Sequence, residues 1–379
     1  MPPDAPSSPL REVVLLFLRL GFTAFGGPAA HIALMEREVV QQRGWLDREA
    51  FLDLLGLTQL IPGPNSTELA IHLGKLRAGW PGLILGGAAF ILPSALMVGG
   101  LAWAYGRYGA LPSAQGWLYG LKPALIAVVG QALVGFGGTL LTDRLRWTVA
   151  LLALIGAALG VNELALLGAA GLGVLLLRGG WKGGSTLAGF GLPALGTAAG
   201  ATLGPGGVFR AFLKIGSVLY GSGYVLLAFL RAEFVVRHPM LTERQLLDAV
   251  AVGQFTPGPV FTTATFVGWL LQGWKGAVLA TLGIFLPSFV FVALASTMME
   301  KLRASRAARA FLDGVNAASL ALMAMVLLQL GQTALVDGPT MALATASSAL
   351  LLVTRLNPTW VLLGSGLLGW GLQAAGLRS

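Results

Sequence analysis

The chain has 379 residues, of which 55% are hydrophobic and only 11% are charged, and its mean hydropathy is +0.77. A soluble domain carries roughly a quarter charged residues, so this composition excludes an ordinary soluble protein. The formal net charge is +9 and no cysteine is present, which excludes disulfides and cysteine-based metal sites. We attribute the basic balance mainly to loops at one membrane face, not to nucleic-acid binding.

The first predicted elements form an interrupted apolar segment. Residues 1–9 are polar and Pro-rich and are expected to be a disordered tail. An apolar segment follows over residues 10–35 and is broken by Gly-Gly-Pro at 26–28. A charged amphipathic stretch then runs over residues 36–53. The break predicts a discontinuous helix, because glycine and proline both disfavour a helix interior.

The next elements surround a second break, Pro-Gly-Pro at 62–64. The apolar pieces on either side are each shorter than the ~20 residues that a helix needs to cross a bilayer. They therefore predict a re-entrant hairpin. Further apolar helices are predicted over residues 81–105, 116–140, 147–160 and 164–177.

The second half of the chain repeats the first at an offset of about 195 residues. The Pro-Gly-Pro at 62–64 recurs at 257–259, and the Leu-Pro-Ser at 92–94 recurs at 286–288. We therefore predict two homologous units and a Gly-rich linker, over residues 10–178, 208–379 and 179–207, respectively.

The distribution of basic residues indicates how the two units are oriented. With a re-entrant hairpin, each unit crosses the membrane about five times, and an odd number inverts the second unit. The basic residues between positions 301 and 309 join the first unit's basic loops on one face only under that inversion. The fold class predicted is an all-α polytopic membrane protein with inverted repeats and broken helices.

The paired breaks are the candidate substrate site. Proline ends the preceding helix, glycine permits a tight turn, and the second proline suits the first turn of a new helix. That helix begins with unpaired N–H groups and a partial positive charge, which together attract an anion. A structural kink is the alternative for either break alone. The candidate binding residues are Gly26, Gly27, Gln59, Gly63, Asn65, Ser66, Thr67, Gln254, Gly258, Thr262 and Thr263, and the helix-breaking prolines are Pro28, Pro62, Pro64, Pro257 and Pro259.

Several charged residues lie within apolar segments, where an ionisable group is costly. Arg19 and Lys214 are equivalent and either counter an anion, extend to a nearby lipid headgroup or pair with a carboxylate. Lys122 has Asn316 as its second-unit equivalent, so any role there is asymmetric. The candidate proton carriers are Asp53, Asp248 and Glu68, with helix capping or a loop salt bridge as the alternative for Asp53 and Asp248. The three histidines have no matching partners and are assigned no role.

The same motifs resemble the chromate ion transporter family in its long, two-unit form. The likeness lies in Phe25-Gly26-Gly27-Pro28, residues 59–64, Gly79-Trp80-Pro81-Gly82 and Leu92-Pro93-Ser94, and it covers nearly the whole chain. It implies a multi-pass protein of the inner (plasma) membrane that moves chromate, is driven by ion gradients and confers chromate resistance by export. Val260 and Phe261 replace Asn65 and Ser66, so we expect an asymmetric site with more polar contacts from the first unit.

Other functions fit the sequence less well. Sulfate is the main alternative substrate, since sulfate and chromate are both tetrahedral dianions. The sequence contains no motif typical of an intramembrane enzyme. A primary pump would need a phosphate-binding loop, which the sequence lacks. No cofactor or metal is expected. Protons are a candidate coupling ion, and Gly-rich helix faces fit packing within the bundle or within an oligomer.

Overall fold

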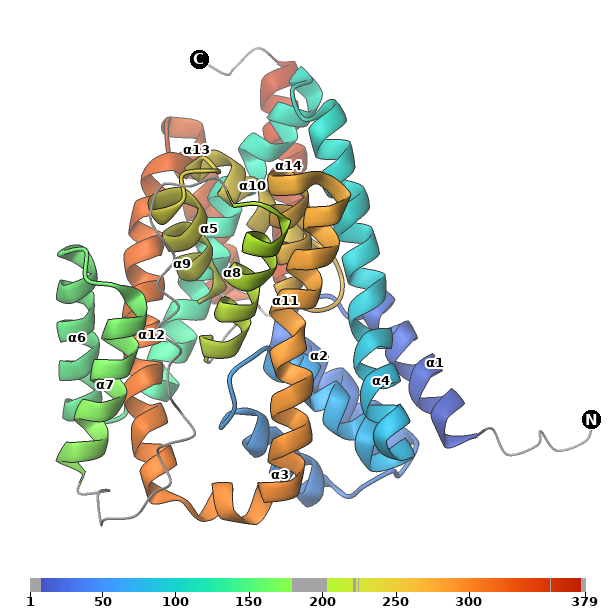
Figure 1. Ribbon diagram of the computed structural model, residues 1–379. Coiled ribbons are helices and arrows are strands. Elements are labelled where there is room, and N and C mark those ends of the chain that lie inside the picture. The colour runs from blue at the N-terminus through green and yellow to red at the C-terminus, as the bar shows by residue number, and fades with distance from the viewer. Residues whose placement is uncertain (1–7, 179–202, 221–222, 224, 355, 376–379) are drawn as a thin grey trace, which may run out of the picture.

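The computed structural model describes residues 8–178, 203–220, 223, 225–354 and 356–375, without the side chains of 298–304. Every regular element in these ranges is a helix (Figure 1). The first half contains α1 (Pro9–Thr23), α2 (Gly27–Glu36), η1 (Arg37–Gln42), α3 (Arg48–Thr58), α4 (Asn65–Tyr108), α5 (Pro112–Leu140), α6 (Arg144–Ala158) and α7 (Glu163–Leu177). The second half contains α8 (Pro205–Val218), α9 (Leu226–Arg231), η2 (Ala232–Arg237), α10 (Glu243–Phe255), η3 (Val260–Thr262), α11 (Thr263–Ala304), α12 (Arg306–Ala334), α13 (Gly338–Val353) and α14 (Pro358–Ala374).

The expected tail and linker lie mostly outside this description. Of the tail, residues 1–7 lie outside the described residues, whereas Ser8 caps α1 and Pro9 begins it. Of the linker, residues 179–202 lie outside the described residues, and α8 begins at Pro205.

The two longest helices, α4 and α11, each fold back on themselves near their start. In α4 the reversal lies at Gly79, whose φ is +63°. The backbones of Gly74 and Gly82 then touch, although these residues would lie ~12 Å apart in a straight helix. In α11 the equivalent turn lies at Gly273, whose φ is +59°. Each element is thus a short helix followed by a long one.

Within the described residues, four helices are long and apolar enough to cross a membrane. They are Asn65–Tyr108, Pro112–Leu140, Val260–Thr297 and Arg306–Ala334. The helices of the α6–α7 and α13–α14 pairs have only 15 to 17 residues each, fewer than the ~20 of a full crossing. The predicted all-helical membrane protein of two homologous halves is confirmed, while the crossing count stays a prediction.

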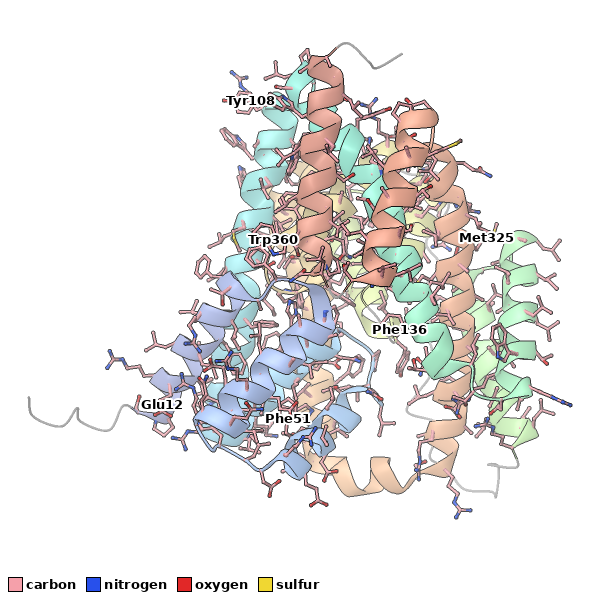
Figure 2. All side chains as sticks on the ribbon, turned by 180° about the vertical axis from the view of Figure 1, so that it is seen from behind. Glu12, Phe51, Tyr108, Phe136, Met325 and Trp360 are labelled. Atoms are coloured by element: carbon pink, nitrogen blue, oxygen red, sulfur yellow. The ribbon has the colours of Figure 1, made fainter. Side chains whose placement is uncertain are left out.

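Equivalent helices of the two halves run in opposite directions. In Figure 2, α5 descends from near Tyr108 at the upper end toward Phe136, whereas α12 ascends toward Met325. Figure 1 likewise has α3 near the lower end and α10 near the upper end. Each helix pair that flanks a Pro-Gly-Pro break therefore enters from its own end of the molecule, as inverted repeats predict.

The halves are interlocked by exchanged packing. The α6–α7 pair of the first half packs on α12 of the second, and the α13–α14 pair packs on α5 of the first (Figure 1). Helices α4 and α11 also pack directly on each other. Because each half supplies the packing surface for the other, the contact between them is part of the hydrophobic core.

An ionic network ties α12 to the first half at the basic end. Arg146 Nη2 lies 2.6 Å from Asp313 Oδ2, and Arg178 pairs with both Asp313 and Asp143. The backbone N–H of Arg146 and the nearby guanidinium groups hold the pKa of Asp143 below its usual value, so this carboxylate stays charged at mildly acidic pH. The start of α12 thus lies beside the first half's basic loop, as the inverted arrangement predicts.

Candidate functional site

The two Pro-Gly-Pro breaks lie where the halves meet. Asn65 begins α4 immediately after the first break, and Val260 begins η3 immediately after the second. Gly63 has φ +137° and Gly258 has φ +87°, conformations that residues with a side chain rarely adopt. These glycines allow each chain segment to reverse between two helices.

Each break is hydrogen-bonded to the other half. The Gly63 N–H donates to the carbonyl of Leu219 at 2.8 Å, and the Gly258 N–H donates to the carbonyl of Ala24 at 2.9 Å. Ala24 and Leu219 are the C-cap residues of α1 and α8 and are themselves equivalent. The two bonds are equivalent under the repeat, so each break docks on the opposite half in the same way.

The Leu-Pro-Ser motifs also pack across the halves. Ser94 Oγ lies 2.8 Å from Thr262 Oγ1, and a Cβ atom on Gly258 would lie 2.7 Å from Ser94 Cβ. The equivalent Ser288 lies beside Gly63 and Glu68. The sequence comparison matched these two serines but gave them no role, and only the fold brings them to the opposite break.

A cavity of about 460 Å³ lies at this junction, within the usual size range of ligand pockets. Its walls come from the two breaks, from the start of α2, from the C-terminal end of α5 near Phe136 and from α12. The residues that line it are Pro28, Ala29, Ile32, Gln59, Pro64, Asn65, Ser66, Phe136, Thr139, Leu140, Gly223, Val225, Val260, Phe261, Asn316, Ser319, Leu320 and Met323. No charged side chain is among these described residues, so any bound ion is held by neutral groups.

The polar lining is concentrated on the first unit and on α12. Asn65 and Ser66 are the first two residues of α4, whose N-cap Pro64 offers no side-chain hydrogen bond. From α12 come Asn316 and the buried Ser319, whose hydroxyl has no hydrogen-bond partner. The N-terminus of α4 therefore opens on a cavity furnished with amide and hydroxyl groups.

The second unit's predicted binding residues lie elsewhere. Gln254, Gly258, Thr262 and Thr263 are buried but do not line this cavity. The hydroxyl groups of Thr262 and Thr263 donate to the carbonyls of Pro259 and Val260, at 2.7 and 2.8 Å. The second break thus contributes apolar wall, through Val260 and Phe261.

The remaining first-unit residues do not line the cavity but lie next to lining residues in the chain. Gly26 and Gly27 form the break before α2, with φ values of +104° and +77°, and Thr67 is fully buried one residue beyond Ser66. Buried His31 connects the two breaks of this unit, because its ring nitrogens lie 3.4 Å from Ser66 Oγ and 3.0 Å from the Ala24 carbonyl oxygen. The repeat comparison overlooked His31, since it has no equivalent in the second unit.

The equivalent cations Arg19 and Lys214 form equivalent ion pairs. Arg19 pairs with Glu38, and Lys214 Nζ lies 2.6 Å from Glu233 Oε2. Neither cation lines the cavity. Both cations therefore pair with a carboxylate, which is one of the roles that the sequence predicted for them.

Lys122 and Asp248 come together between the halves. Lys122 Nζ lies 2.9 Å from Asp248 Oδ1, and the Tyr105 hydroxyl donates to Asp248 Oδ2 at 2.8 Å. Asp248 is only 1% exposed. Its equivalent Asp53 is exposed on α3, so the two carboxylates have different environments.

A smaller cavity of about 120 Å³ adjoins Lys122. It is lined by Tyr119, Lys122, Arg244, Thr333, Ala334 and Val336. Lys122, Thr333 and Ala334 are the repeat equivalents of Asn316, Thr139 and Leu140, which line the large cavity. The two cavities are therefore related by the pseudo-symmetry, but the one beside Lys122 is much smaller than the one beside Asn316.

Replacing Gly63 with Ala is expected to destabilise the protein. The backbone strain alone costs about 1–3 kcal/mol, and the added methyl group would overlap Glu68 and Ser288. Gly100→Ala is the matched control, because a Cβ atom there meets no neighbour. Thermal unfolding of the detergent-solubilised variants measures the difference, and equal melting temperatures would contradict this account of the break.

Inverted, interlocked repeats with broken helices around a cavity between the halves define a class of membrane transporter. The chain belongs to the chromate transporter family, whose model matches residues 11–175 and 206–370. Membership in a family of transporters points away from an enzyme.

Relatives of similar length carry the same two units. The chain is 36% identical over 377 residues to the chromate transport protein of Cupriavidus metallidurans, covering 96% of this chain and 94% of that protein. It is 32% identical over 376 residues to the chromate transport protein of Pseudomonas aeruginosa, covering 93% and 90%. No solved structure matches the chain significantly.

Proposed function

We propose that this protein is a secondary active transporter that exports chromate across the inner membrane and thereby confers chromate resistance. The family membership and the named relatives support chromate as the substrate. Two inverted units that cross the membrane several times support a carrier mechanism. We further propose protons as the coupling ion.

The observation that carries this proposal is the cavity at the start of α4. Asn65 and Ser66 lie at a helix N-terminus, where N–H groups and the helix dipole favour an anion. Asn316 and Ser319 supply further polar groups from the other half. An entirely neutral lining suits a carrier, because a dianion held by fixed cations would be released slowly.

Alternating access follows from the two unequal cavities. We propose that the large cavity is the access path to the site from one end of the molecule and that the small cavity marks a path from the other end that is narrower in this conformation. We propose that transport exchanges the conformations of the two units, so that the small cavity opens while the large one closes. The ion pair between Lys122 and Asp248 holds the second path closed in this conformation.

Radiolabelled chromate flux in proteoliposomes tests the substrate assignment. Purified protein is expected to accelerate chromate entry well above that of empty vesicles. Excess sulfate is expected to compete, since both ions present four oxygens and two negative charges. Saturable sulfate flux without chromate flux would assign sulfate as the substrate, and no flux of either ion would overturn the proposed function.

A further inference from the structure

Glu68 is a fully buried carboxyl group close to the cavity. It lies one helical turn beyond Asn65 in α4, and its side chain is 0% exposed. The carboxyl group lies against Gly63 at the tip of the break and near the Ser288 hydroxyl of α11. Neither carboxyl oxygen has a hydrogen bond of ordinary geometry.

The groups that face Glu68 provide no counter-charge. Tyr220, just after α8, lies within electrostatic reach, and His72 lies one turn further along α4. His31 of α2 is bonded to Ser66 and to a backbone carbonyl. In the part of the chain that the structure describes, no lysine or arginine forms an ion pair with Glu68.

The charges on the other helices packed against α4 are engaged in pairs of their own or exposed. Arg19 of α1 pairs with Glu38, and Asp248 of α10 pairs with Lys122. The acidic residues of α3, including Asp53, are exposed. A buried carboxylate without a cation is strongly unfavourable, so Glu68 is neutral in this conformation.

The second unit has no acid at the corresponding contact. Glu68 is matched there by Thr263, whose hydroxyl donates to the carbonyl of Val260 at 2.8 Å, while Ser94 faces the neighbouring Thr262, and none of these hydroxyl groups ionises near neutral pH. The same cross-unit contact is therefore proton-sensitive in one unit only. This asymmetry favours a role for Glu68 beyond packing, because a hydroxyl group fills the equivalent position in the second unit.

We propose that Glu68 binds the coupling proton and that the proton travels in the same direction as the anion. This inference rests on the proposed transport function. Asn65 and Glu68 are neighbours on α4, so a dianion held at Asn65 repels an ionised Glu68. Anion binding thus favours proton binding at Glu68, and by reciprocity the proton favours the anion.

The cycle balances in charge and in protons. The Glu68 carboxylate takes a proton from water at one membrane face and releases it to water at the other, and the anion is chemically unchanged. One dianion and one proton together move a net charge of −1. An interior-negative membrane potential drives that net charge outward, whereas an acidic exterior opposes the outward proton, so in this cycle the potential drives export.

Proteoliposomes that contain a trapped pH-sensitive dye test the direction of coupling. The membrane potential is clamped with potassium and valinomycin, at alkaline pH values where chromate remains a dianion. Chromate entry is expected to acidify the lumen, and an acidic exterior is expected to accelerate entry. Alkalinisation of the lumen would show exchange of the anion for a proton and would overturn the proposal.

The variant Glu68→Gln tests the site. In this variant we expect the stimulation of chromate entry by the pH gradient to fall at least about tenfold, the size of a typical coupling. Exchange of labelled for unlabelled chromate is expected to persist. Glu49→Gln, at an exposed position of α3, is the matched control and should keep the stimulation.

The possible outcomes separate the two proposals. Glu68→Asp keeps the carboxyl group and should retain lumen acidification even if Glu68→Gln folds poorly. Full stimulation by the pH gradient in a folded Glu68→Gln protein would overturn the role of Glu68. If the wild-type protein carries chromate without moving protons, only this inference fails. If it carries no oxyanion, the proposed function fails as well.

Discussion

Replacement of Asn65 with Leu is expected to abolish concentrative chromate transport while the protein still folds in membranes. Asn65 lines the cavity at the first turn of α4, where its amide can donate to an oxyanion. The loss of one hydrogen bond to a charged partner costs about 1.5–3 kcal/mol, roughly 10- to 100-fold in affinity. Leucine also places apolar bulk where the anion would lie.

Flux and melting temperature, measured on the same preparation, distinguish loss of the site from loss of the fold. Thr345→Leu is the control, because Thr345 is an exposed residue of α13 remote from the cavity lining. Thr67→Leu should also impair transport. It does not test the cavity lining directly, because Thr67 is fully buried and does not line the cavity. Undiminished chromate flux in a folded Asn65→Leu protein would refute the site at the α4 terminus.

Replacement of Asp248 with Asn is expected to cause the largest loss of stability. The substitution removes the carboxylate that lies 2.9 Å from Lys122 Nζ and leaves that ammonium in a buried environment. Breaking one partner of a buried ion pair costs about 3–5 kcal/mol. The melting temperature should fall markedly, and the path beside the small cavity should no longer stay closed.

A double replacement separates charge from packing. Lys122→Gln combined with Asp248→Asn leaves two neutral groups that can hydrogen-bond, so it should recover most of the lost stability. Lys214→Gln with Glu233→Gln is a suitable comparison, since that buried pair lies within one unit. Additive losses at Lys122 and Asp248 would show that the two residues do not act as a pair.

The duplication was the part of the fold that the sequence predicted best. Proline and glycine have backbone requirements that apolar neighbours do not share, so the Pro-Gly-Pro and Leu-Pro-Ser motifs were recognisable in both units. The basic residues near position 306 then predicted inversion, which the opposite directions of α5 and α12 confirm. These inferences depend on local backbone chemistry and on charge at the membrane surface.

The boundaries of the helices were less predictable. The first apolar piece after the Pro-Gly-Pro break and the following long helix form one element, α4, reversed at Gly79. The close approach of Gly74 and Gly82 decides that geometry. The sequence of such a glycine pair is the same whether the two glycines pack against each other, against another helix or against a second protomer.

From sequence alone, one can establish that this is a duplicated membrane protein with two broken helices, because proline and glycine act on their own stretch of chain. Only the tertiary structure shows that each break docks on the other unit, that α12 completes the cavity with Asn316 and Ser319, and that Glu68 is buried beside Ser288. Those contacts join residues roughly 150 to 250 positions apart, and exchanged packing between inverted units determines them. No local sequence pattern predicts which residue of one unit will contact which residue of the other.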